Sequence, residues 1–220
     1  MDSSGAKPAA TAADRERVVA LFLEAVGAGE GPRAFVDRLL ADFDEDELPG
    51  WDTAAVADLF IGLWTRGAEA GLGGSIILDA AACCDPAGRP LDVLTVCEAD
   101  KPFLIDSIMG ELAAQGLEVR AMFHAAEDRP SGRMGVMAVV LGRVGEDRKP
   151  ALIDGLRATL ADVCAAVADF TRMQALMQSA TAELAAAKVK RAPDAVAEDL
   201  EFLRWMTADR FVFLGARTYV

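Results

Sequence analysis

Between residues 75 and 170 the hydrophobic pattern of the chain alternates between two periods. Short apolar runs rich in valine, isoleucine and leucine predict β-strands at residues 75–80, 91–97, 117–124 and 134–141. Two longer segments, 102–115 and 150–170, repeat apolar residues every three or four positions and predict helices. Within the second, 163–170 would also suit a strand, but its alanine content favours a helix.

Turn-forming residues predict how these elements connect. The stretch from Asp85 to Pro90 is dense in turn formers, so the strands at 75–80 and 91–97 should form an antiparallel hairpin. Pro102 suits the first turn of the helix that follows, and Asp100 is a candidate N-cap. The sheet is therefore expected to have four strands and two covering helices.

The flanking regions have helical patterns of their own. Residues 1–13 have no apolar period and are expected to be a disordered lead-in, and residues 14–73 predict a subdomain of three short helices. Asp52 or Thr53 should cap the third of these helices. The acidic run 44–47 is typical of a solvated turn, and the glycines at 71–74 indicate a hinge.

Beyond residue 170 the pattern predicts a helical connector, 171–210, and then a strand. A capping-box pattern over 171–174 indicates that a new helix begins there. Residues 211–215 alternate phenylalanine, valine and leucine, so 211–220 would be the first strand of a following, truncated domain. We therefore expect the chain to be a fragment of a longer protein.

Composition and charge exclude several classes of function. The chain has 220 residues, of which 53% are hydrophobic, so a sizeable core is possible. A formal net charge of −13 argues against nucleic-acid binding and against binding to an anionic membrane surface. There is neither an apolar stretch of about 20 residues nor a signal-peptide core, so we expect a cytoplasmic protein.

The sequence contains no recognisable catalytic constellation. It has a single histidine, His124, and it lacks nucleophile-elbow, Walker and dinucleotide-binding motifs. Its four cysteines do not form a Cys-x-x-Cys pair and are best explained as small apolar residues. We therefore assign no catalytic residue and no metal ligand, and we expect the fragment itself to be inactive.

One junction could bind a small molecule. The strand at 91–97 is followed by a polar turn and a helix start, where backbone N–H groups can hold a carboxylate or another anion. An ordinary capped helix start would explain the same residues. The candidate effector-binding residues are Asp100, Lys101, Pro102, Phe103 and Asp106.

Two motifs carry a resemblance to a known family. Residues 100–108, Asp-Lys-Pro-Phe-Leu-Ile-Asp-Ser-Ile, resemble a stretch in the N-terminal region of the large bacterial NAD-specific glutamate dehydrogenases. Residues 201–215, with Phe-Leu-Arg-Trp followed by Phe-Val-Phe-Leu-Gly, resemble a second motif of that family. Lys101, Ala125, Ala216 and Thr218 depart from its usual pattern.

The resemblance implies an α+β, ferredoxin-like or ACT-like domain over residues 74–170, with the strands in the order 75–80, 91–97, 134–141, 117–124. It implies a non-catalytic regulatory or assembly segment with an amino-acid effector at the 100–106 junction. The fragment would then hold no cofactor, and NAD would bind in the full-length enzyme, which deaminates L-glutamate oxidatively to 2-oxoglutarate. Its partners would be the rest of the polypeptide and other subunits. A purely structural interaction module without a ligand is the alternative.

Overall fold

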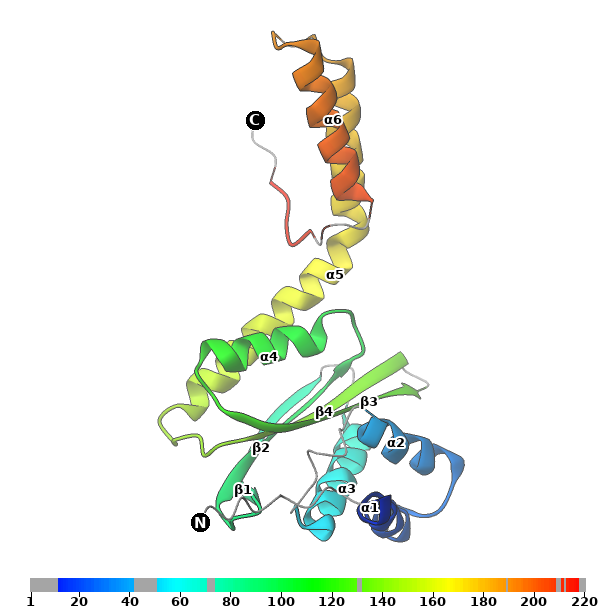
Figure 1. Ribbon diagram of the computed structural model, residues 1–220, viewed down its shortest axis with the longest axis vertical. Helices are drawn as coiled ribbons and strands as arrows, with labels where there is room; N and C mark the ends of the chain where they lie inside the picture. The colour runs from blue at the N-terminus through cyan, green and yellow to red at the C-terminus, as the bar shows by residue number, and fades with distance from the viewer. Residues whose placement is uncertain are drawn as a thin grey trace, which may run out of the picture. The chain divides into compact units, whose positions relative to one another are not determined.

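The structure is a computed structural model that describes residues 12–41, 51–70, 74–129, 132–188, 190–208, 211 and 213–217. The chain divides into two compact units at Leu160. The first unit contains, in chain order, α1 (Ala12–Val26), α2 (Glu30–Ala41), α3 (Thr53–Glu69), β1 (Ser75–Cys84), β2 (Pro90–Ala99), α4 (Leu104–Ala114), β3 (Val119–Arg129), β4 (Gly132–Leu141) and the beginning of α5 (Lys149–Ala186). The rest of α5 and α6 (Pro193–Thr207) belong to the second unit (Figure 1).

The four strands form one antiparallel sheet in the order β1-β2-β4-β3. This order and the α+β class confirm the prediction. Each strand is longer than its apolar run: β1 continues to Cys84, and β3 and β4 include the polar residues that flank the turn between them. The β1–β2 register is regular from Ser75 to Asp79 and then shifts before Cys83. This shift is a bulge, and Ala81 within it has a φ of +50°.

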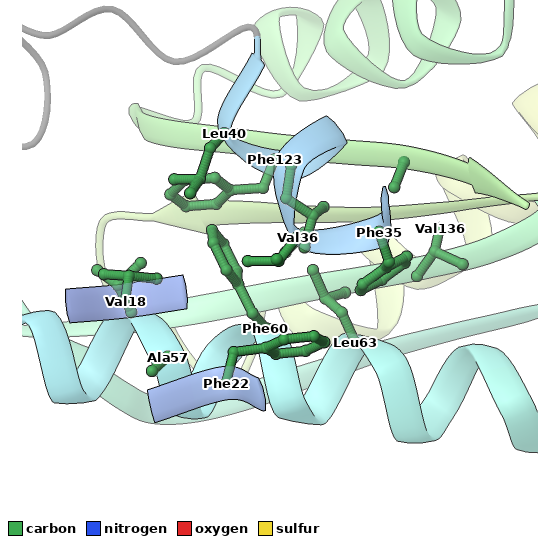
Figure 2. Close-up of a cluster of buried hydrophobic side chains, with 14 of the residues drawn as sticks. Val18, Phe22, Phe35, Val36, Leu40, Ala57, Phe60, Leu63, Phe123 and Val136 are labelled. Carbon is green, nitrogen blue, oxygen red and sulfur yellow. The ribbon is translucent and has the colours of Figure 1, made fainter. Parts of the chain in front are cut away.

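Helices α1, α2 and α3 cover one face of the sheet (Figure 1). Side chains from these helices and from β2, β3 and β4 form one buried core, part of which is drawn in Figure 2. The rings of Phe60 in α3 and Phe123 in β3 meet edge to face, with centroids 4.9 Å apart. Burying one such aromatic side chain stabilises the fold by roughly 1.5–3 kcal/mol before the entropy of ordering it is counted. The predicted subdomain boundary at residue 73 lies outside the described residues.

Helix α4 and the first turns of α5 cover the opposite face (Figure 1). The strand residues of this face alternate with those of the α1–α3 core, and Leu94, Met137 and Val139 are fully buried there. Gly135 of β4 faces α4, since a side-chain carbon at this position would lie at an ordinary van der Waals distance, 3.5 Å, from a methyl group of Leu104. The two predicted covering helices therefore occupy this face.

Two predictions for the C-terminal part of the chain differ from the structure. α5 is continuous from Lys149 to Ala186, so no helix break occurs at 171–174. The capping-box pattern there lies among alanine-rich helix formers, and no proline or glycine interrupts the backbone ladder. The expected strand at 211–215 is not seen in the residues of that segment that the structure describes, 211 and 213–215. Phe211 and residues 213–217 have irregular backbone, and no described strand lies next to them to supply backbone partners.

Other terminal predictions hold in part. Asp52 is the N-cap of α3, and its carboxylate accepts a hydrogen bond from the Ala54 N–H at 2.9 Å. Residues 163–170 are helical, as preferred. The predicted lead-in, 1–13, lies outside the described residues except for Ala12 and Ala13, which already belong to α1. The acidic run 44–47 also lies outside the described residues. Among the described helices, none is long and apolar enough to cross a membrane.

Candidate functional site

The junction between β2 and α4 is an exposed turn with an unusual helix start. β2 ends at Ala99 and α4 begins at Leu104, so Asp100–Phe103 form the connection. Phe103 is the N-cap residue, its φ is +67°, and its side chain makes no capping hydrogen bond. A bulky residue with positive φ costs roughly 1–2 kcal/mol, and such strain tends to persist at sites that bind ligands. The ring of Phe103 is 46% exposed.

Asp100 is held away from the helix start by Arg133 of the neighbouring strand β4. The Asp100 N–H donates to the Arg133 carbonyl oxygen at 2.9 Å, and Arg133 Nε donates to Asp100 Oδ2 at 2.7 Å. This hydrogen bond, with the charge of Asp128 nearby, raises the pKa of Arg133. The prediction that Asp100 caps the helix is therefore wrong, because a cation on β4 captures its carboxylate and the helix begins three residues later.

Glu98 anchors the base of the turn. One of its carboxylate oxygens accepts a hydrogen bond from the Ala99 N–H at 3.0 Å and lies 3.8 Å from Lys101 Nζ. Gly74, with a φ of +68°, makes room for this carboxylate. A side-chain carbon at position 74 would lie 2.3 Å from Glu98 Oε2 and 3.1 Å from the Cys97 carbonyl oxygen. Glu98 therefore fixes the end of β2 and holds Lys101 within the turn that follows.

The five predicted site residues lie together around the start of α4. Pro102, Phe103 and Asp106 are exposed, and Asp100 and Lys101 are half-buried. Asp106 is in the first helical turn, where an acidic side chain favours the positive end of the helix dipole. The segment 100–106 thus presents a cation, an exposed ring, a carboxylate and the first-turn amides of α4 close together. Such groups match the carboxylate, ammonium and side chain of an amino acid.

Sequence reasoning missed Arg133, which fixes the carboxylate of Asp100. A signal was available, since the correctly predicted order of strands places β2 beside β4. The register pairs Ala99 with Met134, so Asp100 comes opposite Arg133. Pairing the predicted strands residue by residue would have identified the partner of Asp100.

A second polar group, Asp92 in β2, is fully buried and structural. Its carboxylate accepts hydrogen bonds from the Ala81 N–H at 2.9 Å and the Val144 N–H at 3.0 Å, and it pairs with Arg143. Burial on its own would raise the pKa of Asp92, but these N–H donors and the cations Arg143 and Lys149 outweigh burial and lower it. The carboxylate therefore joins the β1 bulge, β2 and the loop after β4.

Two of the cysteines, Cys83 and Cys97, have thiols whose pKa is raised by their surroundings. Burial raises the pKa of Cys97, although a hydrogen bond with Ser75 and the nearby arginines Arg129 and Arg66 oppose it. Burial, with the neighbouring charges of Cys84 and Asp92, raises the pKa of Cys83 to about 11. Thiolates are the reactive form, so these cysteines are unsuited to nucleophilic or redox chemistry at neutral pH.

The fold and this junction define the chain's class as an ACT-like α+β protein, with the sheet order expected for that class. Comparison with known proteins then shows what the chain is similar to. Residues 35–128, from α2 into β3, match the family described as glutamate dehydrogenase, ACT1 domain. The chain is also 30% identical over 150 residues to an NAD-specific glutamate dehydrogenase of Halomonas elongata. The matched residues are therefore similar to an N-terminal ACT-like region of the NAD-specific glutamate dehydrogenases.

The match covers only a small part of the relative. It takes in 57% of this chain and 9% of the Halomonas elongata protein. The family match also begins before the predicted domain boundary at residue 74 and ends before the one at residue 170. The division of the chain at these two positions therefore stays a prediction.

Proposed function

We propose that this chain is a non-catalytic regulatory segment of a large NAD-dependent glutamate dehydrogenase, and that an amino-acid effector binds at the β2–α4 junction. The observation that carries the proposal is the strained, exposed helix start at Phe103 on an ACT-like sheet. The parent enzyme would convert L-glutamate to 2-oxoglutarate in sequence outside this chain. Regulation then requires that effector binding favours one state of that enzyme over another.

The proposed contacts follow from the charges around the turn. The effector's α-carboxylate accepts hydrogen bonds from the first-turn amides of α4, where the helix dipole is positive, and Lys101 adds a favourable charge. Its ammonium group pairs with Asp106, which is exposed in the same turn. The Phe103 ring covers part of the effector's side chain. Asp100 takes no direct part in this arrangement, because Arg133 already occupies its carboxylate.

The β2–α4 turn does not have the form of a Rossmann dinucleotide site for NAD. A dinucleotide site needs a glycine-rich turn between a strand and a helix, so that the backbone can approach the pyrophosphate. The β2–α4 turn instead carries Asp100, Lys101, Pro102 and Phe103. In this proposal the cofactor therefore belongs to the part of the enzyme outside this chain, and a glutamate-dependent NAD reduction assay of the chain should give only background.

Calorimetry with a panel of amino acids tests the effector site. We expect one or a few of them to bind, and Asp106→Asn should weaken binding roughly tenfold, since it removes a charged partner worth about 1.5 kcal/mol or more. Asp58→Asn is the matched control, because Asp58 is exposed on α3 on the opposite face of the sheet. No heat with any amino acid would contradict effector binding and favour the purely structural module.

A further inference from the structure

The first two helices of the chain, α1 and α2, border a cleft with a volume of about 740 Å³. All of its lining residues belong to these two helices, so the cleft is separate from the β2–α4 junction. Pockets that hold small molecules commonly have volumes of about 300–1,000 Å³. The cleft therefore has room for a ligand, and the side chains that line it decide which kind.

Much of the lining is apolar. Val19 and Leu23 on α1 are partly buried, and Leu40 on α2 is only 4% exposed. Ala20 is exposed beside them, and its single methyl group leaves space between the helices. A concave surface that combines such apolar groups with a few polar ones suits a ligand with an apolar body.

At one end of the cleft, a hydrogen bond already joins the two helices. The guanidinium of Arg15 donates to the carbonyl oxygen of Leu40, in the last turn of α2. Carbonyl groups in the last turn of a helix have no partner within the helix, so this bond holds the end of α2 against α1. Glu16, which is exposed, follows Arg15 in the lining, and the two opposite charges leave this end without a net charge.

Arg33, about two helical turns or ~10 Å along α2 from Leu40, has hydrogen-bond donors to spare. Within the described part of the chain, both of its hydrogen bonds run from Nε to the carboxylate of Asp37, at 2.8 and 3.0 Å. The terminal amino groups Nη1 and Nη2 keep their donors, and the side chain is 58% exposed. This edge of a guanidinium fits a carboxylate through two parallel hydrogen bonds.

We propose that the α1–α2 cleft binds an organic monocarboxylate with an apolar chain of medium length. The carboxylate pairs with Nη1 and Nη2 of Arg33, and the chain extends along Val19 and Leu23 toward Leu40. This site goes beyond the proposed amino-acid effector site, because its ligand needs no ammonium group and because the two sites share no residue.

A chemical-shift titration of the whole 220-residue chain by ¹H–¹⁵N NMR tests the site, with sodium octanoate below its micelle concentration as the probe. We expect saturable shifts of the amides that line the cleft. Hexanoate and butanoate should bind more weakly, by about two- to fourfold for each CH₂ removed, because less apolar surface leaves water. Octylammonium, which has the same chain and the opposite charge, should not bind. The proposal is overturned if octanoate gives no saturable shift or if octylammonium binds more tightly.

Three variants locate the site. Arg33→Gln should weaken octanoate binding roughly tenfold, since it removes a charged hydrogen-bond partner. Asp37→Asn should tighten binding, because Asp37 is a second carboxylate on the same guanidinium. Ala20→Phe should abolish binding by filling the cleft. Arg17→Gln and Ala25→Phe are the matched controls, because both positions are exposed on α1 outside the cleft, and they should leave binding unchanged.

Each result has a defined meaning. Circular dichroism establishes that the variants are folded, as exposed positions should allow. Octanoate binding that Arg33→Gln and Ala20→Phe both leave unchanged overturns the proposal. So do shifts that concentrate around Phe202 and Trp205 of α6 and leave α1 and α2 unaffected, because octanoate would then bind an exposed apolar surface. No amino acid is present in this test, so its failure is independent of the effector proposal.

Discussion

At the scale of single residues, Asp92 shows how one polar side chain in an apolar strand can hold three segments together. It lies in the middle of the strand sequence Leu-Asp-Val-Leu, where burial of an unpaired charge would be prohibitive. The N–H groups of Ala81 and Val144 and the guanidinium of Arg143 compensate it. Ala81, whose φ is +50°, donates its N–H to this carboxylate from within the β1 bulge.

We expect Asp92→Asn to lower the free energy of unfolding by roughly 1–3 kcal/mol at pH 7, because it leaves a buried donor and Arg143 without their charged partner. The folded-state pKa of Asp92 lies below the ordinary 3.8, so its charge stabilises the fold above about pH 4. That contribution is lost as the pH falls through the lowered pKa. Urea unfolding at pH 7 and below pH 4 should therefore show a gap between wild type and variant that closes in acid.

The exposed Asp154→Asn serves as the comparison for this measurement, since Asp154 is on the surface of α5 and its ion pair with Arg157 is exposed. It should change stability little at either pH. A stability gap for Asp92→Asn that stays constant into acid would mean that the loss of a hydrogen-bond acceptor, and not the loss of charge, explains the effect.

At the scale of elements, the hydrophobic periodicity of the sequence predicted the positions of the four strands well. Four apolar runs predicted the strands, and the turn formers at Asp85–Pro90 predicted the first hairpin, whereas the order of the strands followed from the family resemblance. In that hairpin the Asp85 carboxylate accepts the N–H groups of Ala87 and Arg89, which is the local reason for the turn. Strand pairing depends on patterns that a sequence displays directly, and so it could be predicted.

Helix ends and side-chain partners were harder to predict because they depend on distant groups. The capping pattern at 171–174 has a short, common form, and only the surrounding helix decides whether it acts. The strand expected at 211–215 needs a neighbour that its own residues cannot supply. The local sequence predicted Asp100 as the N-cap, but strand pairing places Arg133 beside it, and Arg133 binds its carboxylate. No local rule predicts a positive φ at Phe103.

Phe103→Gly separates stability from binding at the start of α4. Glycine relieves the strained φ, worth roughly 1 kcal/mol, against the loss of a half-exposed ring, so the free energy of unfolding should change by less than about 1 kcal/mol. Amino-acid binding should weaken markedly, because the ring that covers the effector is gone. Thermal unfolding and calorimetry on the same samples measure both effects.

Ala81→Gly provides the matched comparison, since it also relieves a positive φ while keeping the N–H that Asp92 accepts. It should leave amino-acid binding unchanged. If Phe103→Gly binds amino acids as tightly as the wild type does, the exposed ring has no part in the site, and the strain at this helix start needs another explanation.

At the scale of the whole molecule, burial is very unevenly distributed. The strands β2 and β4 are almost wholly buried between helices on both faces. In contrast, none of the described residues of α6 is buried, and Phe202 and Trp205 are 54% and 46% exposed. Trp205 stacks on Phe202 and meets Phe211 edge to face, with centroids 5.9 and 5.3 Å apart. Local stability should follow this difference in burial.

Hydrogen exchange on two alanine variants measures that difference. Phe60→Ala removes a fully buried ring and should cost about 3–5 kcal/mol, so protection of the β2 and β4 amides should fall sharply while α6 stays unchanged. Trp205→Ala loses only surface aromatic pairs, worth about 0.5–1.5 kcal/mol each, and should affect exchange in α6 alone. A parallel loss of protection in both units would mean that they unfold as one cooperative body, despite the sparse burial of α6.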